Sequence, residues 1–204
     1  MNTRISLLCP TRKRPLEIAR MLNSAFSTAS RPDLLEAILY TDWDDTLTAP
    51  ALQEVRASNA AILQIIGPRI VLSECWNRAY ALSTGDILHH CGDDIVWRTP
   101  DWDNIVRAEF ARFPDRIAFV FGNDGGHPPG TFGTHGFIHR RWAQALGYFV
   151  PPYFSSDYND TWLNDVARLI DRWRYAPLLT EHMHLCFRKG PLDETHKERL
   201  ERGE

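Results

Sequence analysis

Apolar runs short enough to be strands alternate with helix-like stripes over the first 95 residues of the chain. Four of these runs indicate buried strands, at residues 5–9, 37–40, 60–66 and 86–91. Apolar residues at helical spacing follow the first and the third run, over residues 15–26 and 72–82. Strands and helices that alternate in this way form a mostly parallel sheet flanked by helices. The sequence therefore predicts an α/β fold.

Polar side chains follow the ends of three of the predicted strands. Thr11 and Arg12 come after the first, Asp42 after the second, and Asp93 with Asp94 after the fourth. The carboxyl ends of parallel strands share one edge of a sheet, and ligands bind in the crevice beyond that edge. An unpaired buried carboxylate is costly, so the aspartate pair either lies at an exposed turn or holds a cation. We expect these residues to line one binding site.

The second half of the chain has a less regular pattern. Further helices are predicted at residues 102–110, 142–146 and 162–173, and further strands at 117–121 and 180–187. The period of two in a strand would place His182 and His184 on one face of the last strand. Residues 122–136 form a loop rich in Gly, Pro and His, long enough to suggest a functional role. The charged segment after Gly190 is expected to be loosely held.

Size and charge fit one globular domain that is not built to bind nucleic acid through a broad basic face. The chain has 204 residues, and its formal net charge is −3. No apolar run approaches the roughly 18–20 residues of a membrane span, and the first ten residues do not have the pattern of a signal peptide. Four cysteines lie far apart without a CxxC pair. They predict small buried apolar side chains in a cytoplasmic, reducing compartment, and neither a disulfide framework nor a zinc site.

One short segment matches a phosphatase motif. Residues 42–46, Asp-Trp-Asp-Asp-Thr, match the DxDxT motif of haloacid-dehalogenase-like phosphatases, which would make Asp42 the nucleophile. In that family the motif follows the first strand, whereas a strand and a helix precede it here. The family also needs a lysine between its acidic motifs, and residues 47–92 contain none. This interpretation stays an alternative, as does a nucleotide-binding module without catalysis.

The order of short motifs along residues 4–185 resembles nucleotide-sugar glycosyltransferases of the GT-A fold, especially the large family 2. The motifs are Pro10-Thr11-Arg12, Asp42, Arg69, Asn77 and Gly92-Asp93-Asp94. The resemblance implies a single GT-A-like, Rossmann-like domain over residues 1–190, followed by a charged tail over 191–204. It divides the domain into a nucleotide-binding half, 1–95, and an acceptor or catalytic half, 96–190. The implied function is metal-dependent transfer of a sugar from a nucleotide-diphosphate sugar, with UDP as the expected nucleotide.

The resemblance also implies a donor site and a metal site. The residues implied for binding the nucleotide sugar are Pro10, Thr11, Arg12, Asp42, Trp43, Arg69, Asn77 and Asp93. Mn²⁺ or Mg²⁺ would neutralise the leaving diphosphate. Asp94 is the expected ligand, but Gly92 replaces the first aspartate of a strict DxD motif and leaves the choice between Asp93 and Asp94 open. A late histidine, His184 or His182, is implied as a further ligand.

Catalytic and acceptor-binding residues are implied in the second half. Asn159-Asp160 resembles the E-D pair that supplies the general base in family 2, so Asp160 is the expected base and Asp157 the second choice. Asp160 could instead be a helix N-cap. His135 and Gly136 resemble an acceptor-side segment. The expected acceptor is a glycan or a small hydroxyl compound, and a hydroxylated base in phage-type DNA is a further possibility because arginines at 140–141 and 168–174 could form a strip.

Overall fold

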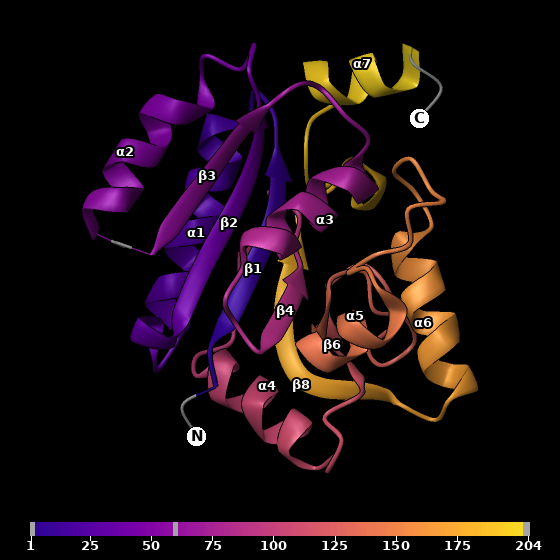
Figure 1. The fold of residues 1–204 in the computed structure, drawn as a ribbon. Helices are drawn as coiled ribbons and strands as arrows, with labels where there is room; N and C mark the ends of the chain where they lie inside the picture. Colours follow the sequence, from indigo (N-terminus) through magenta and orange to yellow (C-terminus); the bar gives the residue numbers. More distant parts are fainter. Residues whose placement is uncertain (1–2, 59–60, 202–204) are drawn as a thin grey trace.

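The computed structural model describes residues 3–58 and 61–201 (Figure 1). Its strands are β1 (Ile5–Thr11), β2 (Leu35–Asp42), β3 (Ile62–Gly67), β4 (Ile87–His90), β5 (Ile95–Trp97), β6 (Phe119–Asn123), β7 (Gly136–His139) and β8 (Trp173–His182). Its helices are α1 (Pro15–Thr28), α2 (Thr48–Ser58), α3 (Leu72–Leu82), α4 (Trp102–Ala111), α5 (Arg140–Leu146), α6 (Asn159–Leu169) and α7 (Glu194–Glu201), with 3-10 turns η1 (Pro32–Leu34) and η2 (Leu185–Phe187). Residues 1–2, 60 and 202–204 of the predicted ranges lie outside the described residues.

The strands form one mixed sheet in the order β3-β2-β1-β4-β7-β6-β8-β5. The half made from the first four strands is parallel, because β1 pairs with β2 and β4, and β2 pairs with β3, in the same direction. β7 is antiparallel to both β4 and β6, whereas β6 is parallel to β8. β5 adds an antiparallel edge to β8. The predicted α/β fold with a central, mostly parallel sheet is confirmed.

Two hydrophobic clusters pack on opposite faces of this sheet. Neighbouring residues of a strand point to opposite faces, and Leu7 of β1 packs in the cluster with α1, α2 and α4, whereas Leu8 packs in the cluster with α3, α5 and α6. Figure 1 shows α1 and α3 on opposite sides of β1 and β2. Helices on both faces bury the sheet and leave its carboxyl edge as the place where loops meet.

The end of the chain differs from the prediction. The helix expected to reach residue 173 ends at Leu169, and the chain turns through Asp171, whose φ is 55°, into β8. The last strand is therefore longer and earlier than residues 180–187, and it ends at His182. His184 lies beyond it as the N-cap of η2, so the two histidines do not share a strand face.

The charged tail is also more ordered than predicted. Residues 194–201 form α7, and the Thr195 hydroxyl donates a hydrogen bond to the Arg12 carbonyl over 2.9 Å. All four cysteines are free; three are buried as predicted, but Cys186 is exposed. Among the described residues, no helix combines the length and the apolar character that a membrane crossing requires.

Candidate active site

A cavity of about 630 Å³ lies beyond the carboxyl ends of β1, β2 and β4. Its remaining walls come from the segment between β3 and α3, from α3, from the loop before β7, from the start of α6, from the segment after β8 and from α7. The residues predicted at the strand ends all line it: Thr11, Arg12, Asp42, Asp93 and Asp94. This is the edge at which open α/β sheets bind ligands.

Asp94, His135 and His182 form a compact group in this cavity. One ligand atom from each lies within 4.8 Å of the others. Asp94 Oδ2 and His182 Nε2 are 3.3 Å apart. Burial alone would raise the pKa of Asp94, but the hydrogen bond with His182 and the nearby Arg14 guanidinium help to hold this pKa below its ordinary value. A carboxylate and two imidazoles are a donor set that holds divalent transition-metal ions.

The orientation of His135 supports a ligand role. Its Nδ1 lies 3.3 Å from the carbonyl oxygen of His90. Because a carbonyl oxygen can only accept, Nδ1 donates the hydrogen, and Nε2 of the neutral ring carries a lone pair. Burial lowers the pKa of His135 to about 3, so the ring is neutral at pH 7. Nε2 is buried and has no hydrogen-bond partner in the described part of the chain. A metal ion would bind the lone pair of this nitrogen. The hydrogen bond to the His90 carbonyl would hold the ring in the orientation that this requires.

The two adjacent aspartates point to different partners. Asp93 accepts a hydrogen bond from the Thr11 hydroxyl over 2.8 Å and is paired with Arg14 over 3.0 Å. Burial raises the pKa of Asp93 to about 6, although the charge of Arg14 acts in the opposite direction. Asp94 instead faces the histidines. The geometry thus places Asp94, and not Asp93, in the imidazole group.

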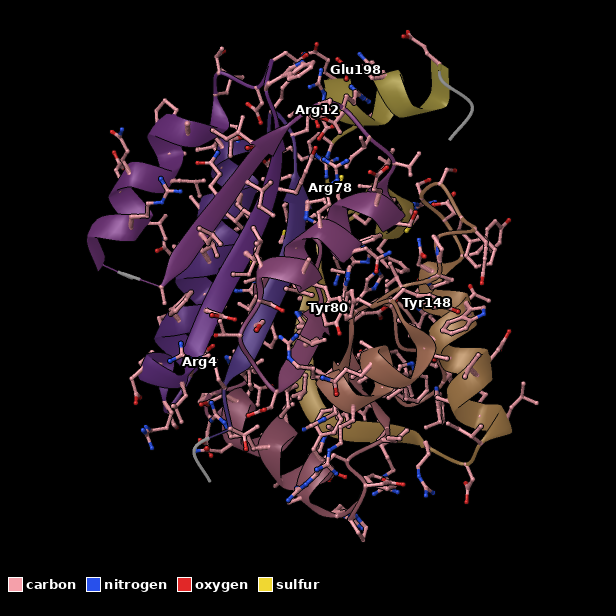
Figure 2. All side chains as sticks on the ribbon, viewed as in Figure 1. Arg4, Arg12, Arg78, Tyr80, Tyr148 and Glu198 are labelled. Atoms are coloured by element: carbon pink, nitrogen blue, oxygen red, sulfur yellow. The ribbon has the colours of Figure 1, made fainter. Side chains whose placement is uncertain are left out.

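The opposite end of the cavity is basic and is covered by the C-terminal segment. Arg12 is paired with Asp42 and Glu198, each over 3.0 Å, and with Asp44. Figure 2 shows Glu198 on α7 and Arg12 next to this helix. Arg69 is paired with the same glutamate. The other pairs to this segment are Lys13 with Glu194, Lys13 with Glu198, and Arg14 with Asp193. Hydrogen bonds from Arg12 and Arg69 lower the pKa of Glu198.

Asp157 and Asp160 line the cavity at the start of α6. The N-cap of this helix is Tyr158, with φ of 70°, so Asp160 lies in the first turn and is not the cap. Its Oδ1 accepts a hydrogen bond from the Thr161 amide over 2.8 Å. Burial raises the pKa of Asp160, which favours a carboxylate able to take a proton.

Four predicted site residues have other surroundings than expected. Trp43 has 70% of its surface exposed and does not line the cavity. Asn77 is used by the backbone, because its amide bonds Phe149 and Val150 over 2.8 and 2.9 Å. Gly136 lies in β7, where an added Cβ would meet the Phe119 ring at 2.1 Å. His184 lines the cavity, but its Nδ1 accepts from the Cys186 amide, and His135 takes its expected place beside Asp94 and His182.

Sequence reasoning assigned His135 to the acceptor and missed its place in the imidazole group. That place depends on β7 pairing antiparallel with β4, which brings residues just before β7 beside those just after β4. The pairing joins strands about 50 residues apart in the chain and leaves no local signal. Asp124 and His127, which form a pair beside the cavity, were also missed, although the Gly- and His-rich loop that holds them was predicted to be functional.

Comparison with known proteins identifies the fold. No family model and no curated protein matches the sequence. The mannosyltransferase PcManGT from Pyrobaculum calidifontis, solved with GDP-Man and Mn²⁺, superposes with a TM-score of 0.73 at 16% identity, over 98% of this chain and 61% of that one. S. aureus TarS superposes with a TM-score of 0.68 at 12% identity, over 97% of this chain and 42% of that one. TarS 1-349 with UDP-GlcNAc gives 0.63 at 13% identity, over 87% and 55%.

The chain therefore spans between 42% and 61% of the length of these three structures. At such low identity the likeness concerns the path of the backbone. The protein has a GT-A-like glycosyltransferase fold, as the order of its motifs predicted.

Proposed function

We propose that the protein is a metal-dependent glycosyltransferase that transfers a sugar from a nucleotide-diphosphate sugar to a hydroxyl acceptor. The observation that carries this proposal is the group of Asp94, His135 and His182, in which a buried ring nitrogen faces the cavity without a protein partner in the described ranges. Of the two expected ions, the transition metal Mn²⁺ accepts imidazole ligands more readily than Mg²⁺, which prefers an all-oxygen shell. Mn²⁺ is therefore the proposed cofactor and Mg²⁺ the alternative; when bound, the ion supplies positive charge to the leaving diphosphate.

The nucleotide diphosphate is proposed to lie over the ends of β1 and β2, against Pro10 and Thr11. Guanidinium groups of Arg12 and Arg69 suit phosphate oxygens, because each offers several N–H donors in a fixed plane. The buried carboxylate of Asp42 suits an N–H of the base. Asp93 is proposed for the ribose hydroxyls, because Thr11 and an arginine already fix its orientation.

The proposed donor is a UDP-sugar. TarS has been solved with UDP and with UDP-GlcNAc, and PcManGT with GDP-Man. All three ligands contain a nucleoside diphosphate, the chemistry that the basic end of this cavity suits. UDP remains the first choice from the sequence, and GDP-Man is the comparison donor in the test below.

Asp160 is the proposed general base, with Asp157 as the second candidate. In an inverting transfer the acceptor oxygen bonds to the anomeric carbon while the bond from that carbon to the diphosphate breaks. The hydroxyl proton passes to the Asp160 carboxylate. Burial raises the pKa of this carboxyl, which makes it a stronger base than an exposed aspartate.

A glycan or a small hydroxyl compound is the proposed acceptor. The arginines that suggested DNA already donate to oxygens of the same chain: Arg140 to Gly85 and Ser83, Arg141 to Asp115, Arg168 to Thr131, Arg172 to Asp115, and Arg174 to Glu109. Two of them, Arg172 and Arg174, are paired with the carboxylates of Asp115 and Glu109, which offsets part of the positive charge that a phosphate backbone would meet. This supports a carbohydrate over a modified base.

A thermal-shift and calorimetric screen tests the proposal. UDP-, GDP-, CMP- and dTDP-sugars are offered with and without Mn²⁺ or Mg²⁺, and release of the nucleoside diphosphate is followed. We expect a UDP-sugar to stabilise the protein only when a metal is present, and Asp94→Ala to lose both effects. Asp33→Asn, an exposed carboxylate outside the cavity lining, is the matched control. Absence of any metal-dependent shift with the whole panel would contradict the proposal.

The same screen separates the alternatives. A non-catalytic module would bind UDP without turnover. A phosphatase would cleave phosphate esters and lose this activity in Asp42→Asn. Asp42 is paired with Arg12 and is 7% exposed, surroundings that support nucleotide recognition over attack on a phosphate.

A further inference from the structure

The loop between β6 and β7 holds a carboxylate–imidazole pair to which the proposed transfer assigns no role. Asp124 follows β6, and its Oδ2 lies 2.6 Å from Nδ1 of His127. Asp124 is 3% exposed, whereas 39% of the His127 side chain is exposed. His127 lines the same cavity as Asp94 and Asp160. The buried member therefore holds the exposed member at the cavity wall.

Four donors fix the Asp124 carboxylate. Its Oδ1 accepts from the amides of Gly126 and His127 over 2.9 and 2.8 Å. Its Oδ2 accepts from the Thr134 hydroxyl over 2.6 Å as well as from the His127 ring. Burial would raise the pKa of Asp124, but these bonds outweigh it and lower the pKa to about 2. An ionised carboxylate can only accept, so Nδ1 of His127 carries the hydrogen, and the lone pair of the uncharged form of the ring lies on Nε2.

Aromatic rings hold the imidazole in place. The His127 ring lies 5.1 Å from that of Phe132 and 5.3 Å from that of Phe187, the second at an interplanar angle of 83°. Phe187 belongs to η2, and it packs so closely on Gly126 that an added Cβ would lie 2.3 Å from its ring. Lys189 donates to the Gly125 carbonyl over 3.1 Å and ties the same segments together. The loop is thus docked on the chain after β8.

A fixed hydrogen-bond acceptor between aromatic walls suits a carbohydrate. Sugars offer hydroxyl donors around the ring edge and C–H groups on the ring faces, and binding sites pair aromatic surface with a few placed polar atoms. Phe132 and Phe187 line the cavity together with His127. In the described ranges no protein donor bonds Nε2 of His127. A hydroxyl group of a bound sugar can donate a hydrogen bond to this nitrogen.

We propose that Nε2 of His127 accepts a hydrogen bond from a hydroxyl of a carbohydrate bound against Phe132 and Phe187, and that Asp124 is the positioning residue that fixes the ring for it. This inference rests on the proposed function, because it assumes that the cavity binds sugar substrates. The sugar comes from the donor or from the acceptor, and the two arms of the test distinguish these sources.

The first arm compares each nucleotide sugar with its own nucleotide. UDP, UDP-Glc, UDP-GlcNAc, GDP and GDP-Man are titrated with Mn²⁺ into the wild type, His127→Ala, His127→Gln and Asp124→Asn. If the donor sugar is the ligand, His127→Ala weakens the nucleotide sugar about tenfold, the loss of one hydrogen bond, and leaves the nucleotide unchanged. His127→Gln keeps an acceptor and restores part of the affinity, and Asp124→Asn shows a smaller loss.

The second arm uses a panel of p-nitrophenyl glycosides as acceptors. If the acceptor is the ligand, His127→Ala leaves donor binding and donor hydrolysis unchanged but raises the KM for the glycoside. Two results overturn the inference. Either no variant changes sugar binding or transfer, or His127→Ala weakens nucleotide and nucleotide sugar equally, which is the sign of a structural role for the loop.

A third measurement does not depend on nucleotide or metal. The ring nitrogens of His127 are observed by ¹⁵N NMR, assigned by their loss in His127→Gln, while methyl glycosides of glucose, mannose and N-acetylglucosamine are added. A response at Nε2 supports the sugar contact even if no nucleotide binds, in which case only the proposed function fails. If nucleotide sugars bind but neither the spectrum nor the variants respond, only the His127 inference fails. If nothing binds and nothing responds, both fail.

Discussion

At one end of the cavity the buried Nε2 of His135 has no hydrogen-bond partner among the described residues, whereas at the other end Arg12 is paired with three carboxylates. A buried polar atom without a partner costs roughly 1–3 kcal/mol. A ligand that bonds this nitrogen therefore removes that free-energy cost at the imidazole end. At the basic end the guanidinium groups are already satisfied, so an incoming anion has to replace ion pairs that exist.

The same contrast appears in how the two ends are built. The imidazole end is made from Asp94 between β4 and β5, from His135 just before β7, and from His182, the last residue of β8, so the sheet itself holds it. The basic end is completed by α7, whose Glu198 is paired with Arg12 and Arg69. We expect substitutions at the first end to remove function and those at the second to adjust it. Four predictions test this difference.

The largest effect is expected from Asp94→Ala. Loss of the carboxylate removes one of the proposed metal ligands and the partner of His182. If the proposed site is correct, several kcal/mol of charge stabilisation at the leaving diphosphate is lost with it. We expect transfer to fall by roughly 10³-fold and Mn²⁺ affinity to fall with it, as measured by calorimetry. His135→Ala should behave alike.

His184→Ala is the matched control for this prediction. His184 lines the cavity, but its Nδ1 accepts a bond from its own turn. We expect its removal to affect Mn²⁺ affinity far less than the removal of His135. An equal loss in both variants would mean that the ion binds elsewhere than in the group of Asp94, His135 and His182.

Asp160→Asn is expected to slow transfer by about 10²-fold or more, with donor affinity unchanged, because only proton transfer is affected. Burial raises the pKa of Asp160, and the base must be deprotonated. The wild-type rate should therefore fall as the pH drops through this raised pKa, and that limb of the pH profile should vanish in the variant. If Asp157→Asn lowers the transfer rate by this amount and Asp160→Asn does not, Asp157 is the general base.

The parallel half of the fold was predictable because its signals are local. An apolar run followed by Thr11, Asp42 or Asp94 predicts a buried strand and the polar group at its end. Parallel strands then place those groups at one edge, and the cavity lining contains all three. The GT-A-like order of motifs rests on the same local features.

The parts that were not predicted depend on distant contacts. His135 joins Asp94 through the pairing of β7 with β4, and α7 meets a loop nearly 190 residues earlier through ion pairs and one hydrogen bond. Asn77 has a side-chain amide of the kind that binds ligands, but this amide donates a hydrogen bond to the backbone carbonyl of Val150. Because β8 ends at His182, this histidine belongs to the sheet, whereas His184 lies two residues beyond the strand.

Asp124→Asn is expected to lower the free energy of unfolding by about 2 kcal/mol at pH 7. The pKa of Asp124 falls from 3.8 to about 2 on folding, and each pKa unit corresponds to roughly 1.4 kcal/mol. Because the folded pKa is the lower one, this stability is fully present above about pH 4 and is lost as the pH falls toward 2. Urea unfolding of both proteins should show a difference that shrinks over this range. A constant difference would assign the effect to packing.

The smallest effect is expected at the basic end, from Glu198→Gln. This carboxylate is paired with Arg12, Lys13 and Arg69, so an entering diphosphate competes with it for the same cations. Partly exposed ion pairs contribute up to about 1 kcal/mol, which corresponds to at most about fivefold in affinity. We expect pyrophosphate and UDP to bind about two- to fivefold more tightly to the variant, with the gain shrinking at high salt.

Glu201→Gln removes the same charge from an exposed position of α7 and should change little. Weaker binding in Glu198→Gln would reverse the comparison, because the helix would then assist the arginines in holding the anion.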